Sequence, residues 1–195
     1  MNQALPGQRA GLPVIVAFGD SLTAGYGAGP GHSYPDYLQR DLDAAGYHYR
    51  IVNLGITGNT TKDALARVHD VLAQRPAVTI VAIGGNDGLR GIPVTDIRAN
   101  LDAILSMLQR SGTRVLIGGI ELPPNYGAQY VQSFNAVYPA LAAKYKAPLL
   151  PFMLQGVWDK PALMQADGIH PTAPGQEVVA QNFLPVLEPM LKKQR

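Results

Sequence analysis

The sequence predicts an α/β fold, namely a three-layer α/β/α sandwich built around a five-stranded parallel sheet. Short apolar runs alternate along the chain with longer segments whose apolar residues recur at helical spacing. The short runs are continuously apolar, which is the pattern of strands that helices cover on both faces. Strands that alternate with helices are joined by right-handed crossovers, and these place helices on both sides of one sheet.

The expected strands are the short apolar runs. They are Val14–Phe18, Tyr49–Asn53, Val78–Ile83, Arg114–Gly118 and Pro148–Phe152. Their order in the sheet cannot be read from the sequence. In the flavodoxin-like order 2-1-3-4-5 the first three strands lie side by side, and ligands of such sheets bind beyond the carboxyl ends of the strands.

The expected helices lie between and after these strands, and several end near a glycine or a proline. They are Tyr34–Ala45, Thr60–Gln74, Ile97–Arg110, Tyr130–Lys144 and Gly175–Leu191. In the last of them, Pro185 and Pro189 should break or kink the second half, because proline lacks the backbone N–H that a helix interior uses.

The composition is that of a globular protein of ordinary size. The chain has 195 residues, of which 47% are hydrophobic and 15% are charged. We expect a flexible N-terminal segment over residues 1–12 and a single domain over residues 13–192. That first segment lacks the apolar core of a signal peptide, so nothing in the sequence as written directs export.

Charge and residue usage argue against several functional classes. The formal net charge is only +2 and the basic residues are scattered, so no nucleic-acid partner is expected. No apolar run approaches the roughly 20 residues of a membrane helix, so no stable membrane insertion is expected. The absence of cysteine excludes disulfides, thiolate metal sites and a cysteine nucleophile. The oligomeric state is not indicated.

Polar segments follow each of the first three expected strands. They are Gly19-Asp20-Ser21, the stretch from Asn53 to Thr60, and Gly84-Gly85-Asn86-Asp87. If those strands lie side by side, their carboxyl ends meet at one edge of the sheet, and the three polar loops converge there.

Ser21 is a candidate nucleophile, but a hydroxyl needs a base to remove its proton. His170 is the candidate base, because Asp167 lies three residues earlier in Asp-Gly-Ile-His-Pro and can fold back within one turn. The carboxylate would hold one ring nitrogen while the other faces the serine. The three residues therefore form a candidate catalytic triad.

The other three histidines fit this role less well. His48 and His69 are expected to face solvent. His32 lies in the Gly/Pro-rich loop after Ser21 and could approach the site, but no acid is placed to orient it.

Acyl transfer also needs donors for the developing oxyanion. The candidates are the backbone N–H of Ser21, the backbone N–H of Gly58 and the side-chain amide of Asn86. Glycine suits the second position because it permits unusual backbone angles and close approach.

Each motif alone has a plainer interpretation. Gly, Asp, Asn and Ser are common turn residues, and Asp167 with His170 could be a structural hydrogen bond or part of a metal site. No further histidine or acid lies at ligand spacing, so no metal is expected. The glycine-rich segments do not fit the known phosphate-binding patterns, and no cofactor is expected.

Together the motifs resemble the four blocks of the GDSL, or SGNH, hydrolase family, in the family's order. The blocks are Gly19-Asp20-Ser21-Leu22, the segment around Gly58, Gly84-Gly85-Asn86-Asp87 and Asp167-Gly-Ile-His170-Pro171. Gly84 to Gly91, Leu122 to Gly127 and Pro148 to Phe152 further resemble the bacterial acyl-CoA thioesterase I, lysophospholipase and arylesterase branch.

The resemblance implies the SGNH hydrolase fold and a serine ester hydrolase that works without a cofactor. Ser21 would be the nucleophile, His170 the general base and acid, and Asp167 its orienting partner. Ser21, Gly58 and Asn86 would form the oxyanion hole, and Gly88 to Ile92 resembles a mobile substrate-binding loop. The substrates would be acyl or aryl esters and thioesters. Members of this branch are usually exported, which would mean a periplasmic or secreted protein whose signal has been removed.

Candidates to line an acyl or aryl pocket are apolar residues near the polar loops, although each could equally be ordinary packing. They are Leu89, Ile92, Pro123, Tyr126, Met153, Leu154 and Trp158. Two other interpretations stay open: a carbohydrate O-acetyl esterase with the same triad and a shallow polar site, and a non-catalytic flavodoxin-like module that binds an anion.

Overall fold

The computed structural model describes residues 11–193, so the expected flexible segment lies outside the described residues except for its last two. Five parallel strands form one sheet in the order β2-β1-β3-β4-β5. The strands are β1 (Val14–Gly19), β2 (Arg50–Gly55), β3 (Val78–Ala82), β4 (Arg114–Gly118) and β5 (Leu149–Leu150). The predicted fold class and the flavodoxin-like strand order are confirmed.

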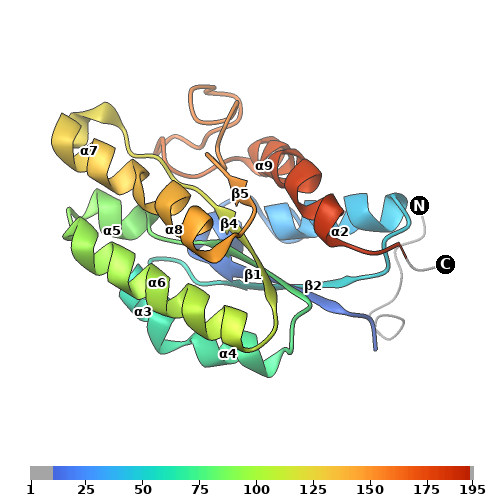
Figure 1. Ribbon diagram of the computed structural model, residues 1–195. Coiled ribbons are helices and arrows are strands. Elements are labelled where there is room, and N and C mark those ends of the chain that lie inside the picture. Colours follow the sequence, from blue (N-terminus) through green and yellow to red (C-terminus); the bar gives the residue numbers. More distant parts are fainter. Residues whose placement is uncertain (1–10, 194–195) are drawn as a thin grey trace.

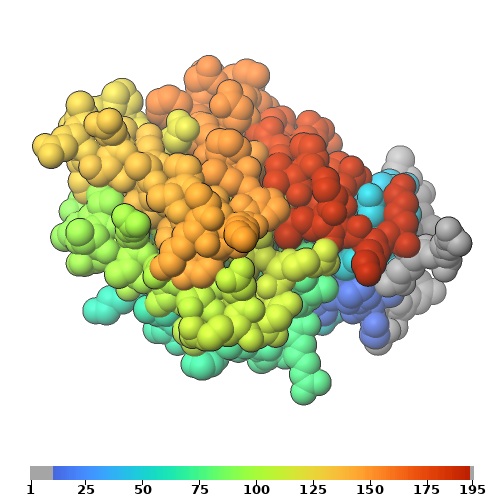
Figure 2. All heavy atoms as spheres, viewed as in Figure 1, coloured from blue at the N-terminus to red at the C-terminus, as the bar shows by residue number. Residues whose placement is uncertain are grey.

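Helices cover both faces of the sheet (Figure 1). They are α1 (Ser21–Ala24), α2 (Tyr34–Ala44), α3 (Thr61–Ala66), α4 (Val68–Ala73), α5 (Gly85–Leu89), α6 (Val94–Arg110), α7 (Ala128–Asn135), α8 (Val137–Tyr145) and α9 (Ala173–Leu187), with 3₁₀ turns η2 (Pro124–Tyr126) and η3 (Glu188–Met190). On one side α2 packs against α9, and on the other α6 contacts α3, α4 and α8. In the space-filling view α9 (red) lies directly beside the preceding segment of the chain (orange) (Figure 2).

The central strands carry the core. Every residue of β1 and β3 is buried, and Ile15, Val16, Ala17 and Phe18 have no exposed surface. Strands of this kind have no solvent side, which explains their continuously apolar sequence. None of the described helices is long and apolar enough to cross a membrane.

Two expected helices are each divided in two. Thr60–Gln74 is α3 followed by α4, with a break at Arg67, where the backbone has φ −114° and ψ 16°. Tyr130–Lys144 is α7 followed by α8, with the division at Ala136. Pro139 explains the second break, because a proline is tolerated in the first turn of a helix but not in the middle of a continuous one.

The C-terminal helix also differs from expectation. It starts at Ala173, behind the N-cap Thr172, whose hydroxyl accepts the Gly175 N–H. It continues through Pro185 and ends at Leu187, and Pro189 lies in the following 3₁₀ turn. The predicted break is therefore displaced toward Pro189.

The register of the sheet brings the polar loops together. Gly19, at the end of β1, is opposite Gly55 of β2 and Ala82 of β3. The three chain segments that follow these strands therefore leave the sheet at the same level, with the Ser21 segment between the other two.

Candidate active site

A sharp turn from β1 into α1 places Ser21. Asp20 caps α1, and its carboxylate accepts the backbone N–H of Leu22 at 3.0 Å. A Cβ on Gly19 would lie 2.1 Å from the Thr23 hydroxyl oxygen and 2.3 Å from the Ala82 carbonyl oxygen. Only glycine fits at that position, and the turn leaves Ser21 7% exposed at the sheet edge.

The loop before α9 places the expected acid and base. Asp167 Oδ1 accepts the backbone N–H groups of Ile169 at 2.9 Å and of His170 at 3.0 Å. Asp167 Oδ2 lies 2.7 Å from His170 Nδ1, and His170 Nε2 lies 2.9 Å from Ser21 Oγ. When the Nδ1 proton is donated to the carboxylate, Nε2 presents its lone pair to the serine hydroxyl. The three residues of the candidate triad thus form one continuous chain of hydrogen bonds.

Hydrogen bonds keep Asp167 ionised, against the small opposing effect of its burial. Its side chain is 38% exposed, whereas that of His170 is 15% exposed. The hydrogen bond to the His170 ring, followed by the backbone hydrogen bond of His170, lowers the pKa of Asp167 to about 2. The carboxylate is therefore charged throughout the pH range in which a histidine ordinarily titrates.

Two residues that sequence reasoning missed support the histidine. Gln165 Nε2 donates to the carbonyl of Tyr26 at 2.7 Å and to that of Pro171 at 2.9 Å, and its backbone N–H donates to the His170 carbonyl at 2.8 Å. The Tyr26 ring lies against the imidazole, with ring centroids 4.7 Å apart. No local pattern marks either residue, because the Gln165–Tyr26 bond joins positions 139 apart in sequence.

The segments after β2 and β3 carry the candidate oxyanion donors. Gly58 has φ +82°, a left-handed conformation, and a Cβ added there would meet nothing within 4 Å. Asn86 lies in α5, and its side-chain Nδ2 donates to the backbone carbonyl of Asn59 at 2.9 Å. That bond fixes which end of the amide is the NH₂ group, and it leaves the second N–H for another acceptor.

Asp87 links α5 to the first residue of α3. Its carboxylate accepts the Thr61 backbone N–H at 2.8 Å and the Thr61 hydroxyl at 2.6 Å. Asn100 completes the contact by donating to the Thr61 hydroxyl oxygen at 3.1 Å. Asp87 is 1% exposed, and burial raises the pKa of its carboxyl. The sequence placed Asp87 in a motif block but gave it no role of its own.

Asp20 is a second buried carboxyl beside the triad. It is 1% exposed, and burial raises its pKa to about 6, against the lowering effect of the Leu22 hydrogen bond. Its position behind the serine gives the site a carboxyl that titrates well above the usual range for aspartate.

The expected pocket residues fall into different environments. Leu89, Ile92, Pro123 and Tyr126 are half-buried, whereas Met153 and Leu154 are 1% and 6% exposed and belong to the core. Trp158 is 44% exposed. Met153 and Leu154 thus belong to the packed core, and the role of these seven residues in an acyl or aryl pocket stays a prediction.

The segment expected to form a mobile loop begins within α5. A Cβ on Gly88 would lie 2.6 Å from the Leu122 side chain and 2.9 Å from the Phe134 ring, so α5 is packed closely against its neighbours. The segment continues to Ile92, whose carbonyl accepts the Tyr130 hydroxyl at 2.6 Å. Its movement stays a prediction.

The remaining histidines lie outside the hydrogen-bonded triad. His48 and His69 are exposed, as expected. His32 Nδ1 lies 2.9 Å from the Tyr37 hydroxyl. Within residues 11–193 there is no group of three His, Cys, Asp or Glu side chains that could hold a metal ion. A cavity of about 490 Å³ is lined by residues such as Arg114 and Pro148 at the opposite end of the sheet, and it contains no residue of the triad.

The sequence is similar to those of known hydrolases over most of its length. The sequence profile described as "GDSL-like Lipase/Acylhydrolase family" matches residues 17–178. "Esterase TesA" of Pseudomonas aeruginosa is 40% identical over 185 residues, which cover 94% of this chain and 92% of that protein. "Thioesterase 1/protease 1/lysophospholipase L1" of Escherichia coli K12 is 37% identical over 183 residues, which cover 93% of this chain and 86% of that protein.

Among solved structures, "Crystal Structure of TesA" superposes with a TM-score of 0.88 at 41% identity and covers 91% of this chain and 99% of its own. The matched region includes all three residues of the candidate triad. This chain therefore belongs to the GDSL-like lipase/acylhydrolase family.

Proposed function

We propose that this protein is a serine ester hydrolase in which Ser21, His170 and Asp167 form the catalytic triad. The observation that carries the proposal is the unbroken path from the Asp167 carboxylate through the imidazole to Ser21 Oγ, with steps of 2.7 and 2.9 Å. A base within hydrogen-bond reach of a hydroxyl, itself oriented by a third group, is the arrangement that nucleophilic catalysis by serine requires. The esterase and thioesterase names of the relatives support it.

The mechanism proceeds through an acyl-enzyme. Ser21 Oγ attacks the ester or thioester carbonyl as Nε2 of His170 takes the hydroxyl proton, and a tetrahedral oxyanion forms. The backbone N–H groups of Ser21 and Gly58 and the amide of Asn86 donate to that oxyanion. His170 then gives its proton to the leaving group, and in the second half it activates the water that releases the acid.

The surroundings of the triad favour acyl or aryl esters over O-acetylated carbohydrates. Tyr26, Ile56 and Ile169 are large apolar residues that are 50%, 46% and 42% exposed. Tyr26 lies on the His170 ring, Ile169 precedes His170, and the Ile56 N–H donates to the carbonyl of Gly19 two residues before Ser21. Apolar side chains exposed beside a reacting centre suit a hydrocarbon or aromatic group better than a sugar.

The test is hydrolysis of p-nitrophenyl esters from acetyl to palmitoyl by the wild type, Ser21→Ala and a control. Ser133 is exposed in α7, which makes Ser133→Ala a matched control for the loss of a hydroxyl. We expect Ser21→Ala to lower kcat by roughly 10⁴-fold or more, and Ser133→Ala to match the wild type. Full activity in folded Ser21→Ala would place the nucleophile elsewhere, and inertness of all three proteins would favour the binding module.

A further inference from the structure

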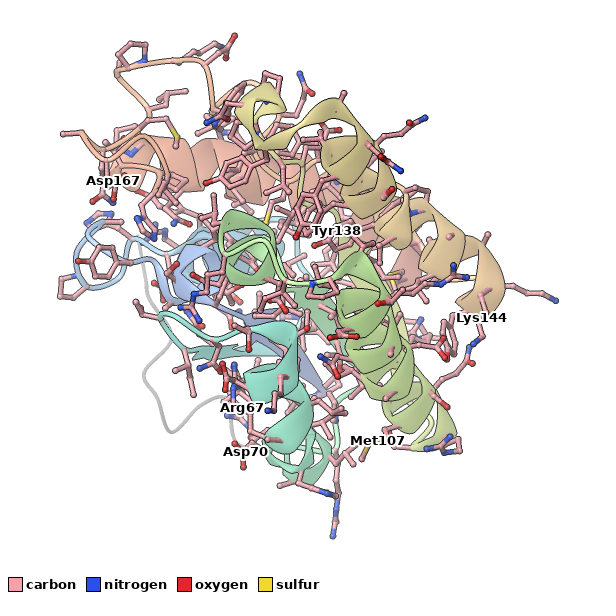
Figure 3. All side chains as sticks on the ribbon, turned by 90° about the vertical axis from the view of Figure 1, so that its left-hand side faces the viewer. Arg67, Asp70, Met107, Tyr138, Lys144 and Asp167 are labelled. Atoms are coloured by element: carbon pink, nitrogen blue, oxygen red, sulfur yellow. The ribbon has the colours of Figure 1, made fainter. Side chains whose placement is uncertain are left out.

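Arg67 is a partly buried arginine to which no step of the mechanism gives a role. It stands at the break between α3 and α4, as Figure 3 shows, while Asp167 lies on a separate loop. Its guanidinium is 4.4 Å from the centroid of the Phe18 ring in β1. Burial lowers the pKa of Arg67, so the protein accepts a desolvation cost to hold a cation there.

The guanidinium reaches three uncharged oxygens that belong to different segments. Nη2 donates to the carbonyl of Gly19 at 2.8 Å, and Nη1 donates to the carbonyl of Leu54 at 2.9 Å. Nε donates to the side-chain Oδ1 of Asn59 at 2.6 Å. One rigid fork therefore joins the ends of β1 and β2 to the loop that carries Gly58, and the compact ammonium of a lysine cannot reproduce this geometry.

Asn59 extends the connection to the candidate oxyanion hole. Its side chain accepts from Arg67, while its backbone carbonyl accepts the Nδ2 proton of Asn86 at 2.9 Å. Asn59 also directly follows Gly58, whose left-handed backbone sets the direction of its own N–H. Both donors outside the Ser21 segment are thus tied to the one residue that Arg67 holds.

This arrangement explains why the helical pattern from Thr60 to Gln74 is interrupted. The break turns Arg67 toward the sheet, where its guanidinium meets backbone carbonyls beside the serine loop. Correct placement matters here, because an oxyanion hole stabilises charge only where its donors are aimed before the reaction begins.

We propose that Arg67 is a positioning residue that holds the Gly58–Asn59 loop and the Asn86 amide in register with Ser21. The inference rests on the proposed function, since it concerns the oxyanion hole of that same reaction. It predicts that loss of Arg67 acts through these two donors: substrate binding is nearly unchanged, and the rate of the chemical step falls.

The first test is a double-mutant cycle of Arg67→Gln and Asn86→Ala, measured as kcat and KM on p-nitrophenyl butyrate. We expect Asn86→Ala to lower kcat by about 10²–10³-fold, and Arg67→Gln to lower it by about 10–100-fold with KM within about 3-fold. The double variant should be slower than Asn86→Ala by clearly less than Arg67→Gln is slower than the wild type, because the part of the Arg67 effect that acts through Asn86 is already lost. Multiplied losses, or full kcat in Arg67→Gln, would overturn the proposal.

Two further variants separate positioning from folding. Asn59→Ala removes only the link, since Arg67 keeps its bonds to Leu54 and Gly19. It should show the same loss in kcat without loss in KM, and the same non-additivity with Asn86→Ala. Arg98 is exposed on α6, so Arg98→Gln is the matched control and should retain wild-type kinetics.

A readout without turnover keeps this inference separate from the proposed function. The Asn86 side-chain NH₂ resonances, assigned through their loss in Asn86→Ala, should shift in Arg67→Gln and in Asn59→Ala but not in Arg98→Gln. If the wild type hydrolyses no ester, the proposed function fails, but these shifts still show whether Arg67 positions the Asn86 amide through Asn59. Unshifted Asn86 resonances in Arg67→Gln would refute the proposed role of Arg67 even if the enzyme is active.

Discussion

Asp167 holds His170 by its backbone and by its ring at once: Oδ1 accepts the His170 N–H at 3.0 Å, and Oδ2 lies 2.7 Å from Nδ1. The Ile169 N–H adds a third bond at 2.9 Å. Three such donors favour the charged carboxylate and outweigh the opposing effect of its slight burial, which agrees with the lowering of its pKa to about 2. The acid therefore fixes the shape of the turn and the tautomer of the base together.

Asp167→Asn should separate these two roles. The amide oxygen can still accept the two backbone N–H groups, but the NH₂ end then faces Nδ1 and favours the tautomer that carries its proton on Nε2. That proton points at Ser21, so the base is lost. We expect kcat for p-nitrophenyl butyrate to fall by about 10²–10⁴-fold at pH 7, with a circular dichroism spectrum like that of the wild type.

The pH dependence of stability gives an independent check on Asp167. Because its pKa is lowered in the folded protein, its stabilising contribution is present above the ordinary carboxyl range and is lost as the pH falls toward about 2. Unfolding by urea at pH 2 to 5 should therefore show a shallower loss of stability in Asp167→Asn than in the wild type. Equal slopes would mean that the hydrogen bonds to Asp167 do not persist in solution.

The sequence predicted the grouping of Ser21, Asp167 and His170 because each belongs to a short motif with recognisable chemistry. The sheet could be predicted for a similar reason, since strands buried on both faces must be continuously apolar. Arg67, Gln165 and Tyr26 could not be found in this way. Each acts through contacts between distant segments, and nothing within a few residues of any of them signals its partner.

The two missed helix breaks have different physical origins. The apolar periodicity of the sequence runs through Arg67 without interruption, and no helix-breaking residue stands there. The break coincides instead with the hydrogen bonds from the Arg67 side chain to the carbonyls of Gly19 and Leu54. The division before Val137 does have a local cause in Pro139, whose effect falls on the preceding turn of helix. Tertiary contacts thus override the local pattern in the first case and not in the second.

Gly58 and Gly46 form a matched pair for testing the oxyanion hole. They have φ of +82° and +78°, and an added Cβ meets nothing within 4 Å at either position. Alanine should therefore cost each variant a similar amount of stability, about 1–2 kcal/mol, for the left-handed conformation alone. Only Gly58 carries a candidate oxyanion donor.

We therefore expect Gly58→Ala to lose kcat by about 10-fold or more, because a strained residue relaxes and turns its N–H away from the oxyanion. Gly46→Ala should keep wild-type kcat. Melting temperatures and p-nitrophenyl butyrate kinetics on both proteins decide the matter. Equal activity in the two variants at equal loss of stability would remove Gly58 from the proposed mechanism.

Asp20→Asn should change how stability depends on pH. Burial raises the pKa of Asp20 from 3.8 to about 6, so between these values the folded protein binds more protons at this site than the unfolded chain. The wild type then loses stability as the pH rises through that window, and the penalty is complete above it. Asparagine cannot ionise, and its Oδ1 can still accept the Leu22 N–H that Asp20 accepts now.

The free energy of unfolding of Asp20→Asn, relative to that of the wild type, should therefore rise between pH 4 and pH 7. The expected gain is of order 1–3 kcal/mol, because burial raises the pKa of Asp20 from 3.8 to about 6. Its pH dependence is the readout, because an unpaired amide NH₂ would impose a cost that does not vary with pH. Urea unfolding at several pH values measures it, with Asp159→Asn as the control on an exposed residue. A difference that stays flat with pH would show that Asp20 ionises freely in the folded protein, and the carboxyl behind Ser21 would then be a permanent negative charge at the site.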